Sequence, residues 1–374
     1  MNVTRIDAPA AGNPVNVSWD DIARLLRLSR PVSALSLSAM SLRDRALAGG
    51  VFETCELTGV DFAGSDLANA CFIDCAMDGV DLRAAALSNT TFVRCRMSGA
   101  RMPLGAATQM VLVDCTLTGS DWQGTHLARS AASGCDFSAA RMRGVRLERS
   151  VLWQAKLQDA DMRDAVLDQA ALCDTDLRHT ALDGLQASLS ALMKNDLRDQ
   201  RLAGTRLLRC QLQGSDLRGA DLRDADLAES GCIQVNFEGA QLDGLRAQRG
   251  MFLSARLAHC SVRGADLTGA LFHAAVVENV SFEDCAMRGS SWEKSRMRDI
   301  GFAGCDLRDA RFDHAAISRG ELVRVQLQAS SFHNTRQTDL RMRGVQRKGL
   351  RGTNAALLEI EAPTLELESI PCAP

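Results

Sequence analysis

Apolar residues recur at every fifth position of this 374-residue chain. Counting from Leu37 in steps of five reaches Leu42 and continues without a break to Phe332. Every residue in this series is Leu, Phe, Met, Trp, Ile, Val, Ala or Cys, and none is charged. A fixed short period that holds over so long a stretch indicates a repeat architecture, in which each copy stacks on its neighbours.

The residues around each apolar centre also follow a pattern. The position two before the centre is mostly small, as at Cys55, Val60 and Ser65, and Asp often lies between the two. Clear copies are residues 215–219 (Ser-Asp-Leu-Arg-Gly), 220–224 (Ala-Asp-Leu-Arg-Asp) and 265–269 (Ala-Asp-Leu-Thr-Gly). With these copies in unbroken register, the chain resembles the pentapeptide-repeat proteins, whose unit reads Ala-Asp/Asn-Leu-x-x. The resemblance covers roughly residues 35–346.

A period of five matches neither an α-helix, with 3.6 residues per turn, nor a simple strand, with two. The resemblance implies an all-β fold, a right-handed quadrilateral β-helix with four pentapeptides in each coil. Four sides of five residues predict a second period of 20, and the sequence shows it. Two sets recur at that spacing and are expected to form inward core ladders, an aromatic ladder of Phe52, Phe72, Phe92, Phe252, Phe272, Trp292, Phe312 and Phe332 and a thiol ladder of Cys55, Cys75, Cys95, Cys115 and Cys135.

The size of the predicted solenoid follows from strand spacing. Stacked coils should lie about 4.8 Å apart, so we expect about 15 coils and a rod of about 70 Å. Its narrow interior has room for one large and one small group on each side. Gly, Asn and Asp in outward positions suit the corners, where the chain must turn.

The repeat divides the chain into segments. Residues 1–34 precede it, and Ser18 followed by acidic residues predicts a short helix that caps the first coil. The repeat itself takes residues 35–346. Its small and apolar positions are poorly filled over residues 185–200, which indicates either an irregular junction or the ordinary degeneracy of a loose repeat.

The C-terminal tail, residues 347–374, lies outside the pattern. It begins with a basic stretch and continues with alternating Leu and Glu, and residues 365–368 have a strand-like period of two. Two interpretations stay open, a cap on the last coil or a dimerisation element that pairs with a second copy to form a homodimer.

The amino-acid composition indicates the cellular compartment of the protein more clearly than it indicates a binding partner. Aromatic residues make up 4% of the chain, charged residues 24%, and the net charge is −3. No segment approaches the roughly 18 consecutive apolar residues of a membrane span, and the N-terminus lacks a basic region followed by an apolar run. The 13 cysteines lie mostly on inward positions, where free Cys acts as a small hydrophobe in a reducing compartment. We therefore expect a cytoplasmic protein with no membrane span.

Catalytic chemistry is not evident in the sequence. The six histidines all fall on outward positions, which predicts solvated surface side chains, and no Gly-rich phosphate loop, nucleophile motif or metal-ligand spacing occurs. Asp recurs at the Asp position of the repeat, where a structural role is sufficient. We expect no enzyme activity, no cofactor and no metal.

The outward charges offer a candidate partner-facing charge ladder. It consists of Asp176, Asp196 and Asp216 in one column, flanked by Arg178, Arg198 and Arg218. Neighbouring Asp and Arg columns offset each other's repulsion as cross-strand pairs do, so a self-neutralising surface is the competing interpretation.

The first functional hypothesis is a non-catalytic scaffold for protein–protein interaction in a bacterial cell, binding a protein of unknown identity. The resemblance implies an alternative, because some pentapeptide-repeat proteins look like B-form DNA and shield DNA gyrase or topoisomerase IV from inhibitors. The balance of 43 basic against 46 acidic residues disfavours this DNA mimicry and nucleic-acid binding alike. A second alternative that the resemblance implies is an accessory or effector protein of a bacterial secretion system.

Overall fold

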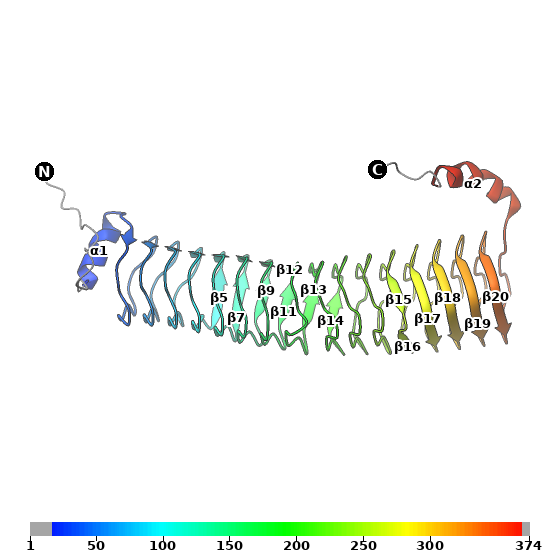
Figure 1. The fold of residues 1–374 in the computed structure, drawn as a ribbon, viewed down its shortest axis with the longest axis horizontal. Helices are drawn as coiled ribbons and strands as arrows, with labels where there is room; N and C mark the ends of the chain where they lie inside the picture. The colour runs from blue at the N-terminus through cyan, green and yellow to red at the C-terminus, as the bar shows by residue number, and fades with distance from the viewer. Residues whose placement is uncertain (1–16, 369–374) are drawn as a thin grey trace. The chain divides into compact units, whose positions relative to one another are not determined.

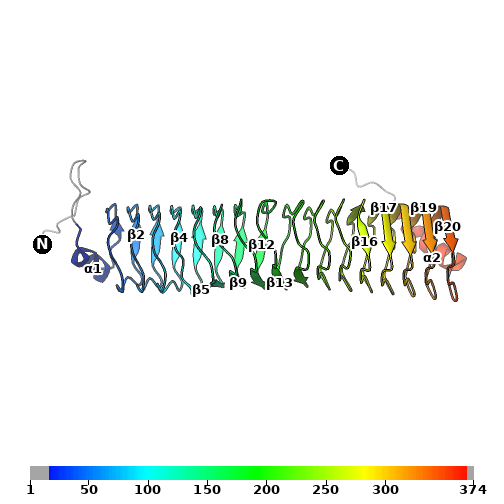
Figure 2. The same ribbon diagram turned by 90° about the horizontal axis from the view of Figure 1, so that it is seen from below.

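The computed structural model describes residues 17–368, with side chains described as far as residue 361. The chain divides into two compact units, Met1–Asp196 (unit 1) and Leu197–Pro374 (unit 2). Both units are stretches of a parallel β-solenoid, about 16 turns in all, accompanied by two short helices. Figure 1 and Figure 2 show the stacked coils of each unit. The predicted four-sided β-helix is confirmed.

Unit 1 contains helix α1 (Trp19–Arg27) and two parallel sheets. The first sheet has the order β1-β2-β3-β4-β6-β8-β10-β12, with β1 Val32–Ser33, β2 Val51–Glu53, β3 Cys71–Ile73, β4 Thr91–Val93, β6 Val111–Val113, β8 Ala131–Ser133, β10 Val151–Trp153 and β12 Ala171–Cys173. The second sheet has the order β13-β11-β9-β7-β5, with β5 Gly105–Thr108, β7 Thr125–Ala128, β9 Arg146–Glu148, β11 Val166–Asp168 and β13 Gln186–Ser188. Paired residues lie 20 apart, as Phe52 and Phe72 do, so one coil takes 20 residues.

Unit 2 contains the remaining elements. They are β14 Arg206–Leu208, β15 Arg256–Ala258, β16 Ser261–Arg263, β17 Val276–Glu283, β18 Arg296–Ala303, β19 Ala316–Val323, β20 Arg336–Arg343 and α2 Ala355–Glu368. The sheet has the order β15-β17-β18-β19-β20, and β16 lies beside β17. Parallel pairing continues beyond the last apolar centre to Gln346 and Arg351. The backbone thus completes a coil that the apolar pattern does not mark, which accounts for about 16 turns where about 15 were predicted.

The aromatic ladder lies in the core of each unit. In unit 1, Phe52, Phe72 and Phe92 stack with ring centroids 4.8 and 5.1 Å apart. In unit 2, Phe272 stacks between Phe252 at 4.8 Å and Trp292 at 4.0 Å, and the ladder continues to Phe312 and Phe332. The Phe–Phe spacings match the distance between paired strands, because the same side chain recurs directly above itself.

The small inward position has a second role as a hydrogen-bond donor. The Thr90 hydroxyl donates to the Leu67 carbonyl at 2.9 Å, and the Cys95 thiol contacts the Phe72 carbonyl at 3.4 Å. All five members of the thiol ladder are buried and free. Hydrogen bonds that the neutral Cys95 thiol makes to the neighbouring thiols, together with burial, raise the pKa of Cys95 and so favour the neutral form. A small Ser, Thr or Cys therefore fills the interior and also places its polar group against a buried carbonyl of the neighbouring coil.

Helix α1 begins where the sequence predicts. The Ser18 hydroxyl accepts a hydrogen bond from the Asp21 amide, and the Asp21 carboxylate accepts one from the Ser18 amide, which forms a capping box. Ile22 is fully buried, and Leu26 lies against the Cα of Gly50, where a Cβ would approach it to 2.9 Å. The helix thus packs on the first coils of unit 1.

Residues 185–200 keep the alternation of inward and outward side chains. The two large polar residues at small positions, Asn195 and Gln200, are 1% and 6% exposed. Asn195 is accommodated because its amide donates to the Leu172 carbonyl at 2.7 Å. The boundary between the two units falls within this segment, and an irregular junction there stays a prediction.

The strand-like interpretation of residues 365–368 is wrong. The backbone there is the last turn of helix α2. Alternation over four residues is too short to select a strand, and both Leu and Glu are good helix formers. The rest of the predicted tail, residues 369–374, lies outside the described residues.

Candidate interaction surface

One side of unit 1 is almost entirely apolar on its outer surface. Strands β2 to β12 of the first sheet point the middle residue inward and the first and third residues outward. We call these outward residues, with residues 191 and 193 in the same columns, the apolar face. They are Val51, Glu53, Cys71, Ile73, Thr91, Val93, Val111, Val113, Ala131, Ser133, Val151, Trp153, Ala171, Cys173, Ala191 and Met193. Glu53 is the one charged residue in this set.

The exposure of the apolar face is greatest around β10. Trp153 is 49% exposed, Val151 42% and Met193 36%. The pairing register places Trp153 directly beside Cys173, so these side chains are contiguous. The indole N–H of Trp153 donates to a carboxylate oxygen of Asp174 at 3.1 Å, which fixes the ring. A contiguous exposed apolar patch with an anchored Trp is typical of an interaction surface.

Leu189 extends this patch at a corner of the coil. It has a φ of +50° and is 56% exposed. Other left-handed corners among the described residues hold Gly, Ala or polar residues, such as Gly59, Asn69 and, in the same column as Leu189, Arg149. A branched aliphatic residue gains nothing there from the fold, so its place beside the apolar face points to contact with another molecule.

Another side of unit 1, which we call the charged face, is built differently. Its outward residues form ion pairs, including Arg163 with Asp161 at 2.6 Å and Arg141 with Asp121 at 3.0 Å. These side chains satisfy one another within the chain. The contrast within one unit shows that apolar outward residues are not a property of the repeat as such.

The predicted charge ladder consists of local ion pairs. In unit 1, Arg178 lies 2.7 Å from Asp176 and 3.2 Å from Asp196. The hydrogen bond from Arg178 lowers the pKa of Asp176 to about 2. In unit 2, Asp216 lies 2.6 Å from Arg218 and 3.8 Å from Arg198.

The same Asp-x-Arg pair occurs in other columns. Asp81 with Arg83, Asp161 with Arg163, Asp221 with Arg223 and Asp306 with Arg308 each make a contact of 2.6 Å. The pair is therefore a local unit of the repeat, which favours the self-neutralising interpretation. A partner-facing role for the ladder stays a prediction.

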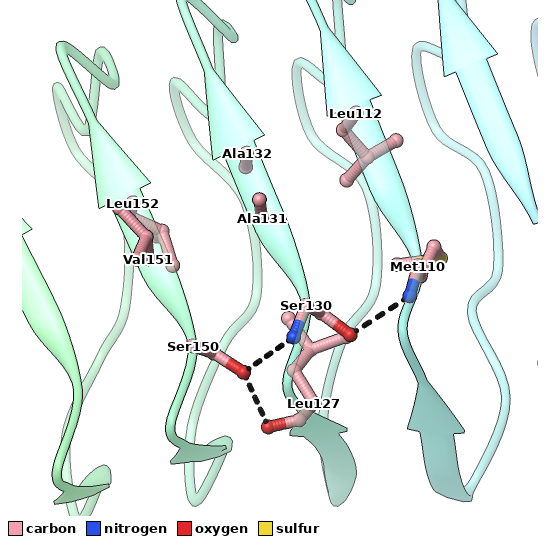
Figure 3. Close-up of a pocket in the computed structure, with 9 residues that line it drawn as sticks. All are labelled: Met110, Leu112, Leu127, Ser130, Ala131, Ala132, Ser150, Val151 and Leu152. Atoms are coloured by element: carbon pink, nitrogen blue, oxygen red, sulfur yellow. Dashed lines mark hydrogen bonds between the residues drawn. The ribbon is translucent and has the colours of Figure 1, made fainter. Parts of the chain in front are cut away.

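A small gap lies beneath the apolar face, between β6, β8 and β10 (Figure 3). It has a volume of about 10 Å³ and arises because Ala132 fills a centre at which Leu112 and Leu152 stand in the adjacent coils. The Ser150 hydroxyl bridges the Ser130 amide and the Leu127 carbonyl across its wall (Figure 3). This volume holds about one water molecule and no substrate.

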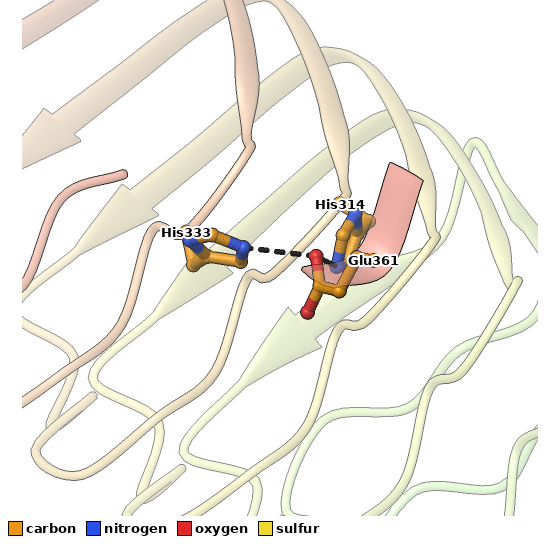
Figure 4. Close-up of side chains that lie close together, drawn as sticks. All are labelled: His314, His333 and Glu361. Carbon is orange, nitrogen blue, oxygen red and sulfur yellow. Dashed lines mark hydrogen bonds and ion pairs between the residues drawn. The ribbon is translucent and has the colours of Figure 1, made fainter. Parts of the chain in front are cut away.

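A cluster of three ionisable side chains lies in unit 2 (Figure 4). Nε2 of His333 lies 3.0 Å from Oε2 of Glu361, and Nε2 of His314 lies 3.3 Å from the same oxygen. Nδ1 of His333 accepts a hydrogen bond from the Asn354 amide at 3.1 Å, and Nδ1 of His314 lies 3.0 Å from the Asn334 side-chain nitrogen. We call His314, His333 and Glu361 the histidine clasp, because they hold α2 against the last coils.

The clasp corrects the prediction that all six histidines are solvated. His333 is only 5% exposed. It does occupy an outward position, but α2 lies over it, and the sequence pattern did not predict a helix there. The chemical signal available was the pair of histidines 19 residues apart, one short of the coil repeat, which places them in adjacent coils.

Two imidazoles and a carboxylate are groups that also bind transition metals. The hydrogen bonds decide between the two roles. Because Nδ1 of His333 accepts from an amide N–H, the ring proton must be on Nε2, the atom that a metal would need. The arrangement therefore fits recognition of the Glu361 carboxylate by two N–H donors, and it does not fit a metal site.

A family model described as pentapeptide repeats matches in 8 copies, over residues 47–83, 111–149, 150–184, 196–230, 205–244 and 252–289. The chain belongs to the pentapeptide-repeat family. No curated protein sequence matches this pentapeptide-repeat chain. Within the residues that the structure describes, no helix has the length and apolar character needed to cross a membrane.

Solved pentapeptide-repeat structures are similar in fold. QnrB1 in its trypsin-treated form, a plasmid-mediated fluoroquinolone resistance protein, is 20% identical with a TM-score of 0.35, over 52% of this chain and 90% of its own. HetL, involved in heterocyst differentiation regulation in the cyanobacterium Nostoc sp. strain PCC 7120, is 20% identical with a TM-score of 0.19, over 80% and 94%. Rfr23 from the cyanobacterium Cyanothece 51142 is 23% identical with a TM-score of 0.20, over 26% and 60%. These likenesses bear on the fold alone.

Membership of the pentapeptide-repeat family explains the inward positions and leaves the outward ones open. The repeat unit requires a large centre and a small partner, but it does not require Trp153 or Leu189 on the outside. What distinguishes this pentapeptide-repeat chain is therefore its outer surface, and the apolar face is the part least explained by folding.

Proposed function

We propose that this chain is a non-catalytic scaffold that binds a protein partner through the apolar face of unit 1. The observation that carries the proposal is the exposure of Trp153 and Val151 within a surface that holds almost no charge. Interfaces are enriched in aromatic residues and depleted of charge at their centres. A partner would remove this surface from water, which stabilises the complex by about 25 cal/mol for each Å² of apolar area buried.

The absence of an assembled reaction centre in the described residues supports binding without turnover. Within residues 17–361, the histidine clasp is the single group of three His, Cys, Asp or Glu side chains whose ligand atoms lie within 4.8 Å of one another. Both ring nitrogens of His333 are already engaged, Nε2 with the Glu361 carboxylate and Nδ1 with the backbone N–H of Asn354. The hollow of about 550 Å³ between α1 and the first coils has only Arg30 and Glu53 as ionisable lining groups.

The proposal can be tested with a photo-crosslinker on the apolar face itself. Cys173 is a half-buried free thiol of this face, and benzophenone maleimide would be attached to it in a Cys71→Ser, Cys372→Ser background. Irradiation in native lysate should give a discrete protein adduct. The adduct should disappear in Trp153→Asp and persist in Arg163→Glu, a matched change on the charged face. Equal loss in both variants, or no adduct in either, would contradict the proposal.

DNA mimicry gains no support from the surface. A mimic of the phosphate backbone needs unpaired negative charge along one side. The carboxylates of the charged face are instead paired with Arg, as at Asp121 and Asp161. We therefore propose a protein partner recognised by apolar contact.

A further inference from the structure

Unit 2 places a helix over the repeat position that is bare in unit 1. His333 and Trp153 occupy the same position of the 20-residue repeat, one residue after a centre. His333 is 5% exposed, because Glu361 of α2 lies against its ring (Figure 4). The backbone N–H of Asn354, the residue before α2, donates to its Nδ1. Trp153 is 49% exposed. The chain itself thus demonstrates that a helix can rest on this side of a coil.

The dimensions of an α-helix match those of the stacked coils. One helical turn rises 5.4 Å, and neighbouring coils lie about 4.8 Å apart. A helix laid along the stack therefore presents one or two apolar residues of an i, i+3, i+4, i+7 stripe to each coil. The three-residue width of the face, about 10 Å, equals the diameter of a helix. From Val111 to Met193 the face spans five coils, which is enough for a helix of about 16 residues.

The shape and charge of the apolar face and its edges indicate which kind of helix would bind there. The column of Ala131, Val151 and Ala171 consists of small side chains and allows a helix backbone to approach closely. Arg129 and Arg149 are exposed at the corners that lead into β8 and β10. They would favour acidic residues on the adjacent flank of the helix. Helix α2, which the clasp holds by Glu361, shows the same chemistry on unit 2.

We propose that the apolar face of unit 1 binds an amphipathic α-helix of a partner protein. The helix lies lengthwise along the coils, with its aliphatic stripe on Val151 and Trp153 and its acidic flank toward Arg129 and Arg149. This inference rests on the proposed function and names the class of partner. It excludes an extended strand, whose two-residue period rises about 6.6 Å and drifts out of phase with the coils.

The test uses three fluorescein-labelled 18-residue peptides and the full-length chain. The first peptide has Leu at i, i+3, i+4 and i+7 with Glu on one flank, the second has the same composition with Leu at alternate positions, and the third has Lys on the flank. Fluorescence anisotropy should show micromolar binding of the first peptide and none of the second. Trp153→Asp should weaken binding of the first peptide at least tenfold, whereas Arg163→Glu should leave it unchanged.

Charge reversal at the corner gives an independent check. Arg149→Glu should weaken binding of the Glu-flanked peptide about threefold or more and should strengthen binding of the Lys-flanked peptide. Equal or tighter binding of the alternating peptide, or no binding of the first, would overturn the helix inference. So would ultracentrifugation showing a dimer that Trp153→Asp dissociates, because a second copy would then occupy the face. If the Cys173 crosslink still captures a partner, the proposed function stands while the helix inference fails.

Discussion

Trp153 in unit 1 and His333 in unit 2 show how one position of one repeat can serve opposite purposes. Both follow a buried centre, Leu152 and Phe332 respectively, so each lies outside the apolar core of its own unit. Outside, Trp153 is exposed among apolar neighbours, whereas His333 is covered by α2. The comparison teaches that inward positions specify the coil, while outward positions specify what lies on it.

The first test of this division between inward and outward positions is a substitution in the core. Phe272→Asp places a charge between Phe252 and Trp292, where no partner can satisfy it, and should cost several kcal/mol of unfolding free energy. The outward neighbour offers a control, since His273→Asn should change stability by less than about 0.5 kcal/mol. Melting temperatures measured by circular dichroism would compare the two. Equal destabilisation would contradict the division into inward and outward positions.

The next test addresses the covered side of unit 2. His333→Leu removes the hydrogen bonds to Asn354 and Glu361, each worth about 1 kcal/mol. Hydrogen exchange of the α2 backbone should therefore accelerate about tenfold or more. The melting temperature should change little, because a solenoid coil depends mainly on its neighbours.

Adding zinc tests whether the histidine clasp is a hydrogen-bonded contact or a metal-binding site. Because the Nε2 proton of His333 is engaged with Glu361, equimolar Zn²⁺ should neither slow hydrogen exchange of α2 nor raise the melting temperature. Zinc-dependent protection that His314→Ala abolishes would show that the clasp binds metal instead.

Acid titration sharpens the account of the paired charges. The pKa of Asp176 falls to about 2 in the folded state through Arg178, whereas an unfolded Asp has a pKa of about 3.9. The ion pair thus contributes stability above about pH 4, and the contribution is lost as the pH falls toward 2. Asp176 is half exposed, so Asp176→Asn should cost at most about 1 kcal/mol at pH 7. Urea unfolding at pH 7, 4 and 2 should show this difference shrinking; a difference that grows in acid would be inconsistent with the pairing.

The smallest effect that we expect is that of the purified protein on the supercoiling activity of DNA gyrase. Since the carboxylates of the charged face are paired with Arg, the protein should neither inhibit supercoiling at micromolar concentration nor protect the enzyme from a quinolone. A supercoiling assay measures both. Clear protection would favour DNA mimicry over the scaffold, and Asp176 would be the first residue to change.

The fold was predictable because its information is periodic and local. Each inward position requires the same kind of residue as the position one coil earlier, as Phe72 and Phe52 show. The pattern is therefore repeated many times along the chain and can be recognised from the sequence. The predicted aromatic and thiol ladders rest on the same periodicity. Helix α1 was predictable from the capping residue Ser18.

The apolar face and the histidine clasp were less predictable, because neither is marked by a periodic pattern in the sequence. The clasp joins His333 to Glu361 across 28 residues, and Glu361 belongs to a helix outside the repeat. The apolar face becomes visible only when residues such as Val151, Cys173 and Met193 are placed in their columns. Leu189 was also missed, since its exposure depends on a corner conformation.

The 20-residue coil sets a rule for changes in chain length. An insertion or deletion of 20 residues within unit 1 adds or removes a whole coil, and every later side chain keeps its side. A change of five residues also keeps Leu and Phe inward, but it rotates all later residues in the unit by a quarter turn. The chain would fold as before, yet the columns of Val151 and Trp153 would no longer line up with those of Val111 and Val113. Length variants that fold equally well should therefore fall into four classes of surface, and members of only one class should retain the partner.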